Sequence, residues 1–213
     1  KKKKKGEIQL PPNRSLYLNR LLKNIRGTQV SKNVEYREMV NGLDKEQLEE
    51  DVTVPNNLSE ILRYYQKTGY KWLKTLDKYH FGGILADDMG LGKTVQMLSV
   101  IVDYIQNTDN QQKKASLVIC PSSLTLNWQN EVKKFAQDIS TLVIRGTLAE
   151  RKHQINQIDN YNLVITSYDL LKRDIELYEK KGYTFRYVIA DEAQYLKNSN
   201  TQNAKSIKKM NAV

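Results

Sequence analysis

The chain has 213 residues, of which 39% are hydrophobic, and this is enough to bury the core of one large domain or of one domain with an extension. No apolar run is long enough to cross a membrane, the lysines at residues 1–5 are not followed by the apolar segment of a secretory signal, and the single cysteine excludes an internal disulfide. The formal net charge of +10 falls to +5 without those five lysines, so charge alone does not establish binding to nucleic acid.

The first part of the chain, residues 1–57, is predicted to be a polar extension with helices. Leucine and isoleucine recur at mostly helical spacing between residues 15 and 26, and a second helix is predicted over residues 32–40. No group of titratable side chains in this part indicates chemistry. We therefore expect an accessory packing layer in front of a second region, residues 58–213.

Aromatic residues gather at the start of the second region, before a helix that is predicted to run to about Tyr79. Gln66 lies near Tyr65, Gly69 and Trp72 on the first turns of this helix. Its side-chain amide offers one donor and one acceptor side by side, which suits the edge of an adenine base. The alternative is an amphipathic helix with a surface glutamine, and this stretch alone does not decide between the two.

The stretch FGGILADDMGLGKT, residues 81–94, predicts a short buried strand, a glycine turn and the start of a helix. Gly90 and Gly92 allow several backbone N–H groups to point into one concavity, and the helix adds the positive end of its dipole. Lys93 can then reach the outer phosphates of a nucleotide, and the hydroxyl of Thr94 can bind Mg²⁺. Because Asp87 occupies the first glycine position of the usual pattern, an ordinary glycine turn stays the alternative until a second element is found.

Strands and helices alternate through the rest of the chain. Apolar strands are predicted at residues 117–120, 142–144, 163–165 and 187–190, and helices at residues 95–106, 124–135, 148–158 and from 168 to about 180. Fully apolar strands separated by helices indicate a mostly parallel sheet covered by helices on both faces. The predicted fold class is therefore α/β, with ligands bound beyond the carboxyl ends of the strands.

An acidic pair, Asp191-Glu192, directly follows the last predicted strand. The aspartate can hold Mg²⁺ opposite Thr94, and the glutamate can orient and deprotonate the attacking water. Acidic residues are also common at helix N-termini because of the helix dipole. Together with a Gly-Lys-Thr loop about a hundred residues earlier, the pair favours a site that binds and hydrolyses ATP with Mg²⁺.

Five motifs occur in the order and spacing of a known family: Gln66 with its aromatic neighbours, DDMGLGKT, ICPSSLTLNW, ITSYDLL and VIADEAQYLKN. Over residues 58–213 the chain resembles the Swi/Snf-type ATPases of the superfamily 2 helicases. Its polar first part and the stretch FGGILADDMGLGKT look more like the bacterial branch of this family. The resemblance implies a RecA-like P-loop lobe of a DNA-dependent ATPase that translocates on duplex DNA and remodels or displaces bound proteins. It further implies a cytoplasmic protein, associated with the nucleoid in a bacterium, or a nuclear one in a eukaryote.

The resemblance also assigns roles to matching positions. Gln66 would contact adenine, Asp191 and Glu192 would coordinate the metal and activate water, and Gln194 would couple the nucleotide to another lobe. The phosphate loop that holds the nucleotide and Mg²⁺ would consist of Asp88, Met89, Gly90, Leu91, Gly92, Lys93 and Thr94. The nucleic-acid backbone would be contacted, without sequence readout, by Pro121, Ser122, Ser123, Arg145, Gly146, Thr166 and Ser167.

The family uses two RecA-like lobes with ATP between them, and this chain ends before a second lobe. The arginines that stabilise the transferring phosphoryl group normally come from that lobe, so we expect poor hydrolysis by this chain alone. Tyr195 also departs from the family, which frequently has arginine there. Two alternatives stay open: an RNA-dependent helicase of the DEAD-box type, and a catalytically silent nucleic-acid-binding module. The intact Lys93, Thr94, Asp191 and Glu192 argue against the silent module.

Overall fold

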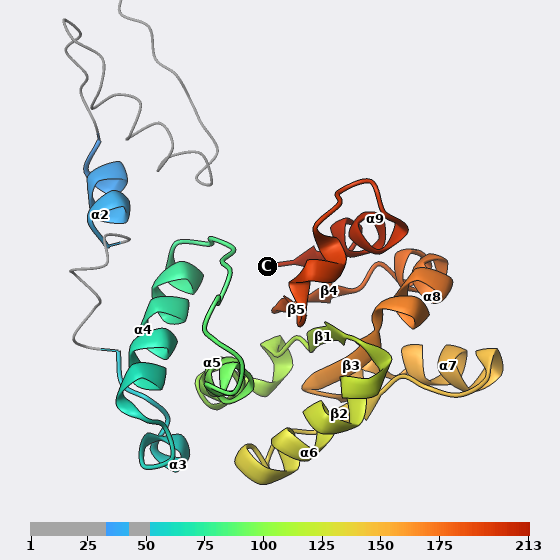
Figure 1. Ribbon diagram of the computed structural model, residues 1–213, viewed down its shortest axis with the longest axis horizontal. Helices are drawn as coiled ribbons and strands as arrows, with labels where there is room; N and C mark the ends of the chain where they lie inside the picture. The colour runs from blue at the N-terminus through green and yellow to red at the C-terminus, as the bar shows by residue number, and fades with distance from the viewer. Residues whose placement is uncertain (1–32, 43–51) are drawn as a thin grey trace, which may run out of the picture. The chain divides into compact units, whose positions relative to one another are not determined.

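The computed structural model describes residues 33–42 and 52–213 (Figure 1). The lysine tract and the helix predicted between residues 15 and 26 lie outside the described residues. The chain divides into two compact units, Lys1–Lys93 and Thr94–Val213, and each is described by itself. The predicted boundary between residues 57 and 58 stays a prediction. No helix among the described residues has both the length and the apolar character needed to cross a membrane.

The described part of the first unit contains three helices: α2 (Val34–Gly42), α3 (Asn56–Ser59) and α4 (Tyr64–Lys78). The helix expected before Tyr79 is confirmed as α4. Its buried face carries Tyr70 and Leu76, and the hydroxyl of Tyr70 donates a hydrogen bond of 3.2 Å to the carbonyl of Thr53. This contact joins α4 to the segment that precedes α3.

Residues 81–88 form an extended loop, and the prediction of a buried strand there is wrong. Ile84 is 80% exposed, and no strand described in the structure pairs with this segment. A strand requires neighbouring backbone to bond its N–H and C=O groups, and two adjacent glycines weaken the preference for one. The segment is instead held at its start, where the N–H of Phe81 donates to the carbonyl of Leu76 at 2.8 Å.

The second unit is built on a parallel sheet with the strand order β2-β3-β1-β5 (Figure 1). Its strands are β1 (Ser116–Cys120), β2 (Thr141–Val143), β3 (Leu163–Ser167) and β5 (Val188–Ala190). All residues of β1 and β3 are buried, as expected of central strands covered on both faces. The predicted parallel α/β sheet is therefore confirmed. A short parallel pair, β4 (Thr184–Phe185) with β6 (Asn211–Ala212), was not predicted.

Helices connect the strands of the sheet. They are α5 (Lys93–Gln106) before β1, α6 (Thr125–Phe135) between β1 and β2, α7 (Leu148–Ile155) between β2 and β3, α8 (Tyr168–Lys181) after β3, and α9 (Gln202–Lys208) near the end. Single 3₁₀ turns are η3 (Asn110–Gln112), η4 (Ser122–Leu124), η5 (Ile158–Asn160) and η6 (Ala193–Leu196).

The direction of each crossover decides which face a helix covers. The connection from β1 to β2 runs across the sheet in the opposite direction to those from β2 to β3 and from β3 to β5. Because parallel crossovers are right-handed, α6 covers one face, and α7 and α8 cover the other. Leu117, Ile119 and Val164 lie in the core on the second face together with Ile155 of α7 and Leu171 of α8.

Candidate nucleotide-binding site

The phosphate loop, residues 88–94, follows α4 in the chain and includes the first two residues of α5. Gly90 and Gly92 have φ angles of +86° and +75°, in the left-handed region where glycine is favoured. The ammonium group of Lys93 donates to the carbonyl oxygens of Asp87 and Asp88, at 2.8 and 3.0 Å. No carboxylate of the described residues forms an ion pair with it, so none of these carboxylates neutralises its positive charge.

Gln66 belongs to this loop through its side chain. It is 7% exposed, which rules out the alternative of a surface glutamine. Its Oε1 accepts from the N–H of Arg63 at 2.9 Å, and its Nε2 donates to the carbonyl of Leu91 at 3.0 Å. Gln66 therefore caps the start of α4 and ties it to the phosphate loop, while its contact with adenine stays a prediction.

Asp191 directly follows β5 and is held by its backbone and its side chain. Its N–H donates to the carbonyl of Ile119 at 2.9 Å, and its own carbonyl accepts from the hydroxyl of Tyr168 at 2.7 Å. The carboxylate accepts from the indole N–H of Trp128 through Oδ2 at 2.8 Å, and from the N–H of Glu192 through Oδ1 at 2.9 Å. The orientation of this carboxylate is therefore set by two donors.

Glu192 has a left-handed backbone, with a φ angle of +53°. Only one other residue besides glycine has a positive φ in the described part of the chain, and such a conformation is strained. The carboxylate of Glu192 accepts a hydrogen bond from the side-chain amide of Gln194. Glu192 is followed by the 3₁₀ turn η6, which contains Gln194. The coupling role of Gln194 stays a prediction.

Tyr195, at one of the positions where the sequence departs from the family, packs on a neighbour of the acidic pair. Its ring stacks on that of Tyr168, with the centroids 5.3 Å apart and the planes at 12°. Burial raises the pKa of Tyr168, and the negative charge of Asp191 adds to the effect, so its hydroxyl stays protonated and donates to the Asp191 carbonyl. The tyrosine pair therefore supports the backbone at the end of β5.

The predicted nucleic-acid contacts divide into accessible and buried side chains. Ser122, Ser123, Arg145 and Gly146 are exposed, and Pro121 is half-buried. Thr166 and Ser167 are both buried, so their side chains are not accessible in this conformation, and a contact between their loop and nucleic acid stays a prediction. The reason for Ser167 is that its hydroxyl accepts from the N–H of Leu170 at 3.2 Å and caps α8. A serine between a strand and a helix is itself a sequence signal for such a cap.

The exposed loop of residues 145–147 is fixed by side chains that the sequence analysis missed. The carbonyl of Gly146 accepts from Nη1 of Arg151 at 2.8 Å, and the N–H of Arg145 donates to Gln154 at 2.9 Å. Arg151 in turn forms two hydrogen bonds to the buried carboxylate of Asp174, at 2.6 and 2.9 Å. These hydrogen bonds with Asp174 raise the pKa of Arg151.

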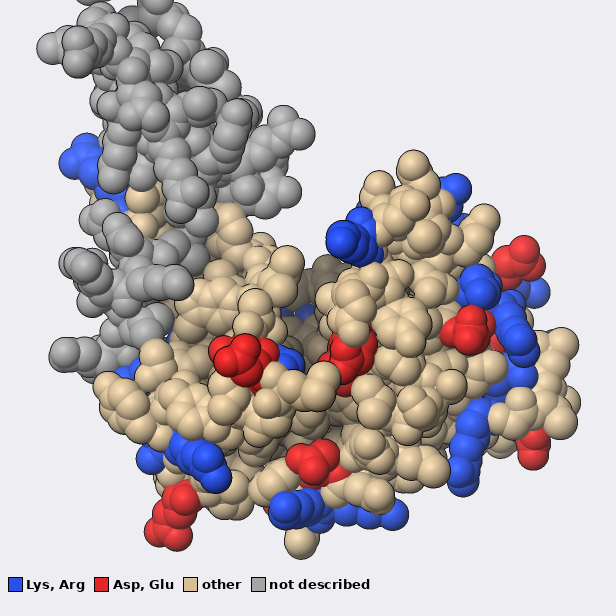
Figure 2. All heavy atoms as spheres, in the orientation of Figure 1, with Lys and Arg blue, Asp and Glu red and all other residues tan. Residues whose placement is uncertain are grey.

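The distribution of charged side chains does not identify a nucleic-acid-binding surface. Figure 2 shows one face of the molecule, on which lysine and arginine side chains gather over α7 and α8 with aspartate and glutamate among them. This mixture agrees with the moderate charge of the chain outside its lysine tract. The candidate contacts therefore rest on the accessible strand-end loops rather than on a basic patch.

The sequence of this chain is similar to those of known proteins. The sequence profile of the SNF2-related domain matches residues 65–213. The chain belongs to this family. An ATP-dependent helicase of Mycoplasma genitalium is 40% identical to this SNF2-related chain over 159 residues, which cover 75% of the chain and 15% of that protein. The TATA-binding protein-associated factor MOT1 of Saccharomyces cerevisiae is 36% identical over 168 residues, which cover 75% of the chain and 9% of MOT1.

A solved structure agrees with the SNF2-related fold. The SWI2/SNF2 ATPase core of Sulfolobus solfataricus, in complex with double-stranded DNA, superposes with a TM-score of 0.64 at 35% sequence identity. The match covers 78% of the present chain and 32% of that core. The RecA-like α/β architecture is thus confirmed. The SNF2-related chain spans only a small part of the length of its curated relatives.

The donor atoms of the SNF2-related chain fit Mg²⁺ that is held together with a nucleotide. Among the described residues, no group of three or more histidine, cysteine, aspartate or glutamate side chains could hold a metal ion. Mg²⁺ commonly binds through one or two carboxylates, with water and substrate phosphates as its other ligands. The Asp191 carboxylate and the Thr94 hydroxyl offer hard oxygen atoms of the type that Mg²⁺ prefers, and their role as its ligands stays a prediction.

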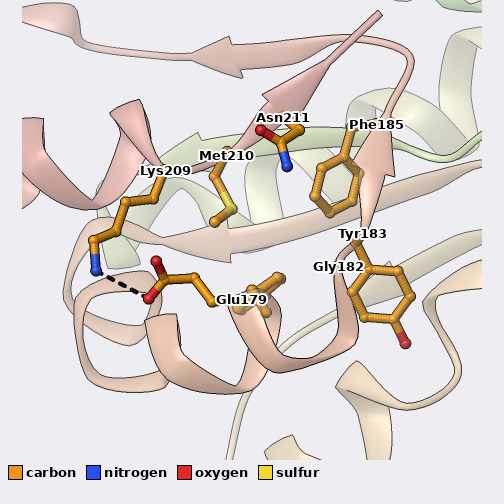
Figure 3. Close-up of a pocket in the computed structure, with 8 residues that line it drawn as sticks. Glu179, Gly182, Tyr183, Phe185, Lys209, Met210 and Asn211 are labelled. Atoms are coloured by element: carbon orange, nitrogen blue, oxygen red, sulfur yellow. Dashed lines mark hydrogen bonds and ion pairs between the residues drawn. The ribbon is translucent and has the colours of Figure 1, made fainter.

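A separate cavity of about 250 Å³ lies beside the short strands β4 and β6. Figure 3 shows its lining, in which Lys209 and Glu179 form an ion pair at 2.9 Å near Met210 and Phe185. None of the residues that line it is a predicted site residue. The cavity is therefore not part of the candidate site of this SNF2-related chain.

Proposed function

We propose that this SNF2-related chain is the ATP-binding lobe of a DNA-dependent ATPase that translocates on duplex DNA and remodels or displaces bound proteins. The observation that carries the proposal is the arrangement of the acidic pair. Asp191 has its carboxylate held by two donors at the end of β5, directly before Glu192. A phosphate loop whose lysine has no acidic partner among the described residues supports the same function.

The proposed roles follow from the chemistry of each group. The phosphates are bound by the loop from Asp88 to Thr94, with Lys93 supplying positive charge and backbone N–H groups supplying donors. Thr94 and Asp191 contribute ligands to Mg²⁺, which supplies charge neutralisation at the phosphates. Glu192 orients the attacking water and accepts its proton. Gln66 holds the loop and contacts adenine, and Gln194 couples the site to a second lobe.

The proposed partners are duplex DNA, a second RecA-like lobe and proteins bound to DNA. Support comes from the Sulfolobus solfataricus core, which was solved in complex with double-stranded DNA and of which this chain covers 32%. We propose that the second lobe lies C-terminal to the lobe formed by residues 58–213, and that Ser122, Ser123 and Arg145 contact the DNA backbone. We also propose that the protein acts in the cytoplasm, at the nucleoid in a bacterium, or in the nucleus in a eukaryote.

ATPase rates of the two-lobe protein test the proposal. We expect stimulation by duplex DNA that exceeds the stimulation by single-stranded DNA or RNA, and loss of turnover in Lys93→Ala and Glu192→Gln. Glu192→Gln keeps the size of the side chain and removes the base, so it should still bind ATP. Stimulation by RNA alone would exclude the duplex-DNA assignment in favour of an RNA-dependent helicase. ATP binding without any turnover in the two-lobe protein would indicate a silent module.

A further inference from the structure

We propose that Trp128 is a positioning residue: its indole N–H holds the Asp191 carboxylate in one orientation and thereby strengthens Mg²⁺-dependent nucleotide binding. The inference rests on the proposed function, in which Asp191 is a ligand of Mg²⁺. It adds a residue on α6, which is separated from Asp191 by 63 positions in the sequence.

The contact between Trp128 and Asp191 is short, and its indole donor is buried. Trp128 is 4% exposed, and its Nε1 lies 2.8 Å from Oδ2 of Asp191. The indole N–H can only donate a hydrogen bond, so it needs an acceptor such as this carboxylate oxygen. Hydrogen bonds to an ionised carboxylate are about twice as strong as those between neutral groups. The buried N–H therefore favours the conformer in which the carboxylate faces it.

The second carboxylate oxygen is also engaged, so the plane of the carboxylate is defined by two donors. Oδ1 accepts from the N–H of Glu192 at 2.9 Å, whereas the indole bonds Oδ2. An ionised carboxylate has roughly four lone-pair sites, so each oxygen keeps capacity for a metal ion or its water. Donors of this kind orient metal ligands, and their removal typically costs about 10- to 100-fold in metal affinity.

The backbone around Asp191 is anchored without help from Trp128. Its N–H bonds to Ile119, and its carbonyl bonds to the hydroxyl of Tyr168. Removal of the indole N–H should therefore release the side chain of Asp191 and leave the end of β5 in place. Trp128→Phe makes this change while it keeps an aromatic ring in the buried position on α6.

The test compares the binding of a fluorescent ATP analogue to the full chain in EDTA and in Mg²⁺. In the wild type, Mg²⁺ should tighten binding. In Trp128→Phe, this gain should fall by about 10-fold, whereas the Kd in EDTA should stay within about twofold of the wild type. The matched control is Trp72→Phe, the same change at the other tryptophan, which should keep the full gain from Mg²⁺.

Three results separate failure of this inference from failure of the proposed function. An unchanged gain from Mg²⁺ in Trp128→Phe would overturn the inference alone. Equal weakening of binding in EDTA and in Mg²⁺ would overturn it as well, because a purely structural role predicts that pattern. The absence of nucleotide binding in both the wild type and Lys93→Ala would instead overturn the function itself.

A spectroscopic measurement on the unaltered side chain covers the case in which Trp128→Phe does not fold. The chain has two tryptophans, so Trp72→Phe assigns the indole N–H signal of Trp128 in a ¹H–¹⁵N spectrum. We expect this signal to move when Mg²⁺ is added to the nucleotide complex, and to exchange slowly with solvent. A signal that does not respond to Mg²⁺ would contradict the proposal.

Discussion

The buried ion pair between Arg151 and Asp174 leads to a quantitative prediction about stability. Arg151 of α7 donates to both carboxylate oxygens of Asp174 in α8, at 2.6 and 2.9 Å, and to the carbonyl of Gly146 at 2.8 Å. Both side chains are buried, so the loss of either one leaves an uncompensated charge in the interior. We expect Arg151→Met and Asp174→Leu each to lower the free energy of unfolding by about 3–5 kcal/mol.

The double variant Arg151→Met/Asp174→Leu should cost less than either single change. It leaves no buried charge, and apolar replacement of such a pair is often close to neutral. The carbonyl of Gly146 still loses its partner, but Gly146 is exposed, so water can replace that bond and the cost should stay at about 1 kcal/mol or less. The double variant therefore separates the energy of the unpaired charge from that of the pair itself.

Urea unfolding followed by the fluorescence of Trp128, in a Trp72→Phe background, reports on the second unit. With a slope of about 2–3 kcal/mol/M, the single variants should lower the midpoint by roughly 1–2 M. The control is the exposed pair of Lys209 and Glu179, where Lys209→Met should cost less than about 1 kcal/mol. Two results would refute the reasoning. One is a loss of less than about 1 kcal/mol in the single variants at Arg151 and Asp174, and the other is a loss in the double variant that equals the sum of the two single losses.

Three further predictions concern residues at the carboxyl ends of the strands. Burial, with the charge of Asp191 as a second cause, raises the pKa of Cys120 from 9.0 to about 12, so its thiol should not react with a disulfide reagent at pH 8 until the chain unfolds. Because only the unfolded thiol ionises above pH 9, this group should lower stability as the pH rises from 9 to 12, in a comparison with Cys120→Ala. Glu192→Gly should be more stable than Glu192→Gln by about 1 kcal/mol in thermal unfolding, because glycine adopts a positive φ without strain, although both should lack turnover. Arg145→Ala should reduce the salt dependence of DNA binding by about one phosphate contact, whereas Ser167→Ala should leave that slope unchanged and destabilise α8 by about 1 kcal/mol.

Local patterns were enough to predict most of the second unit. Continuous apolar runs such as residues 117–120 and 163–165 predicted buried parallel strands, because only a sheet covered on both faces buries every residue of a strand. The same reasoning failed at residues 81–88, where a similar apolar run forms an exposed loop. A short apolar run only favours a strand. Whether a strand forms depends on a neighbouring strand that bonds its backbone, and the run itself does not show whether such a neighbour exists.

Long-range pairs were beyond the sequence analysis for a related reason. The indole of Trp128 and the carboxylate of Asp191 lie 63 residues apart, and Arg151 and Asp174 lie 23 residues apart, each on a different element. Neither pair follows from helical or strand periodicity, since the contact depends on the crossovers that bring the elements together. Ser167 shows the converse, because a motif suggested a ligand contact where the hydroxyl instead caps α8.

The acidic pair combines one firmly held carboxylate with one that is only lightly held, and this difference suits their two proposed tasks. Asp191 is bonded through its N–H, its carbonyl and both carboxylate oxygens, so it can present a metal ligand without reorganisation. The side chain of Glu192 is bonded to Gln194, and its backbone is in a strained left-handed conformation. Relief of that strain favours movement of Glu192, whereas the anchors of Asp191 oppose movement there. We therefore expect ATP or a second lobe to change the conformation of Glu192 and Gln194 while Asp191 stays in place, and amide exchange at residues 191–194 measured with and without Mg²⁺ and ATP would show whether the protection changes at Glu192 and Gln194 alone.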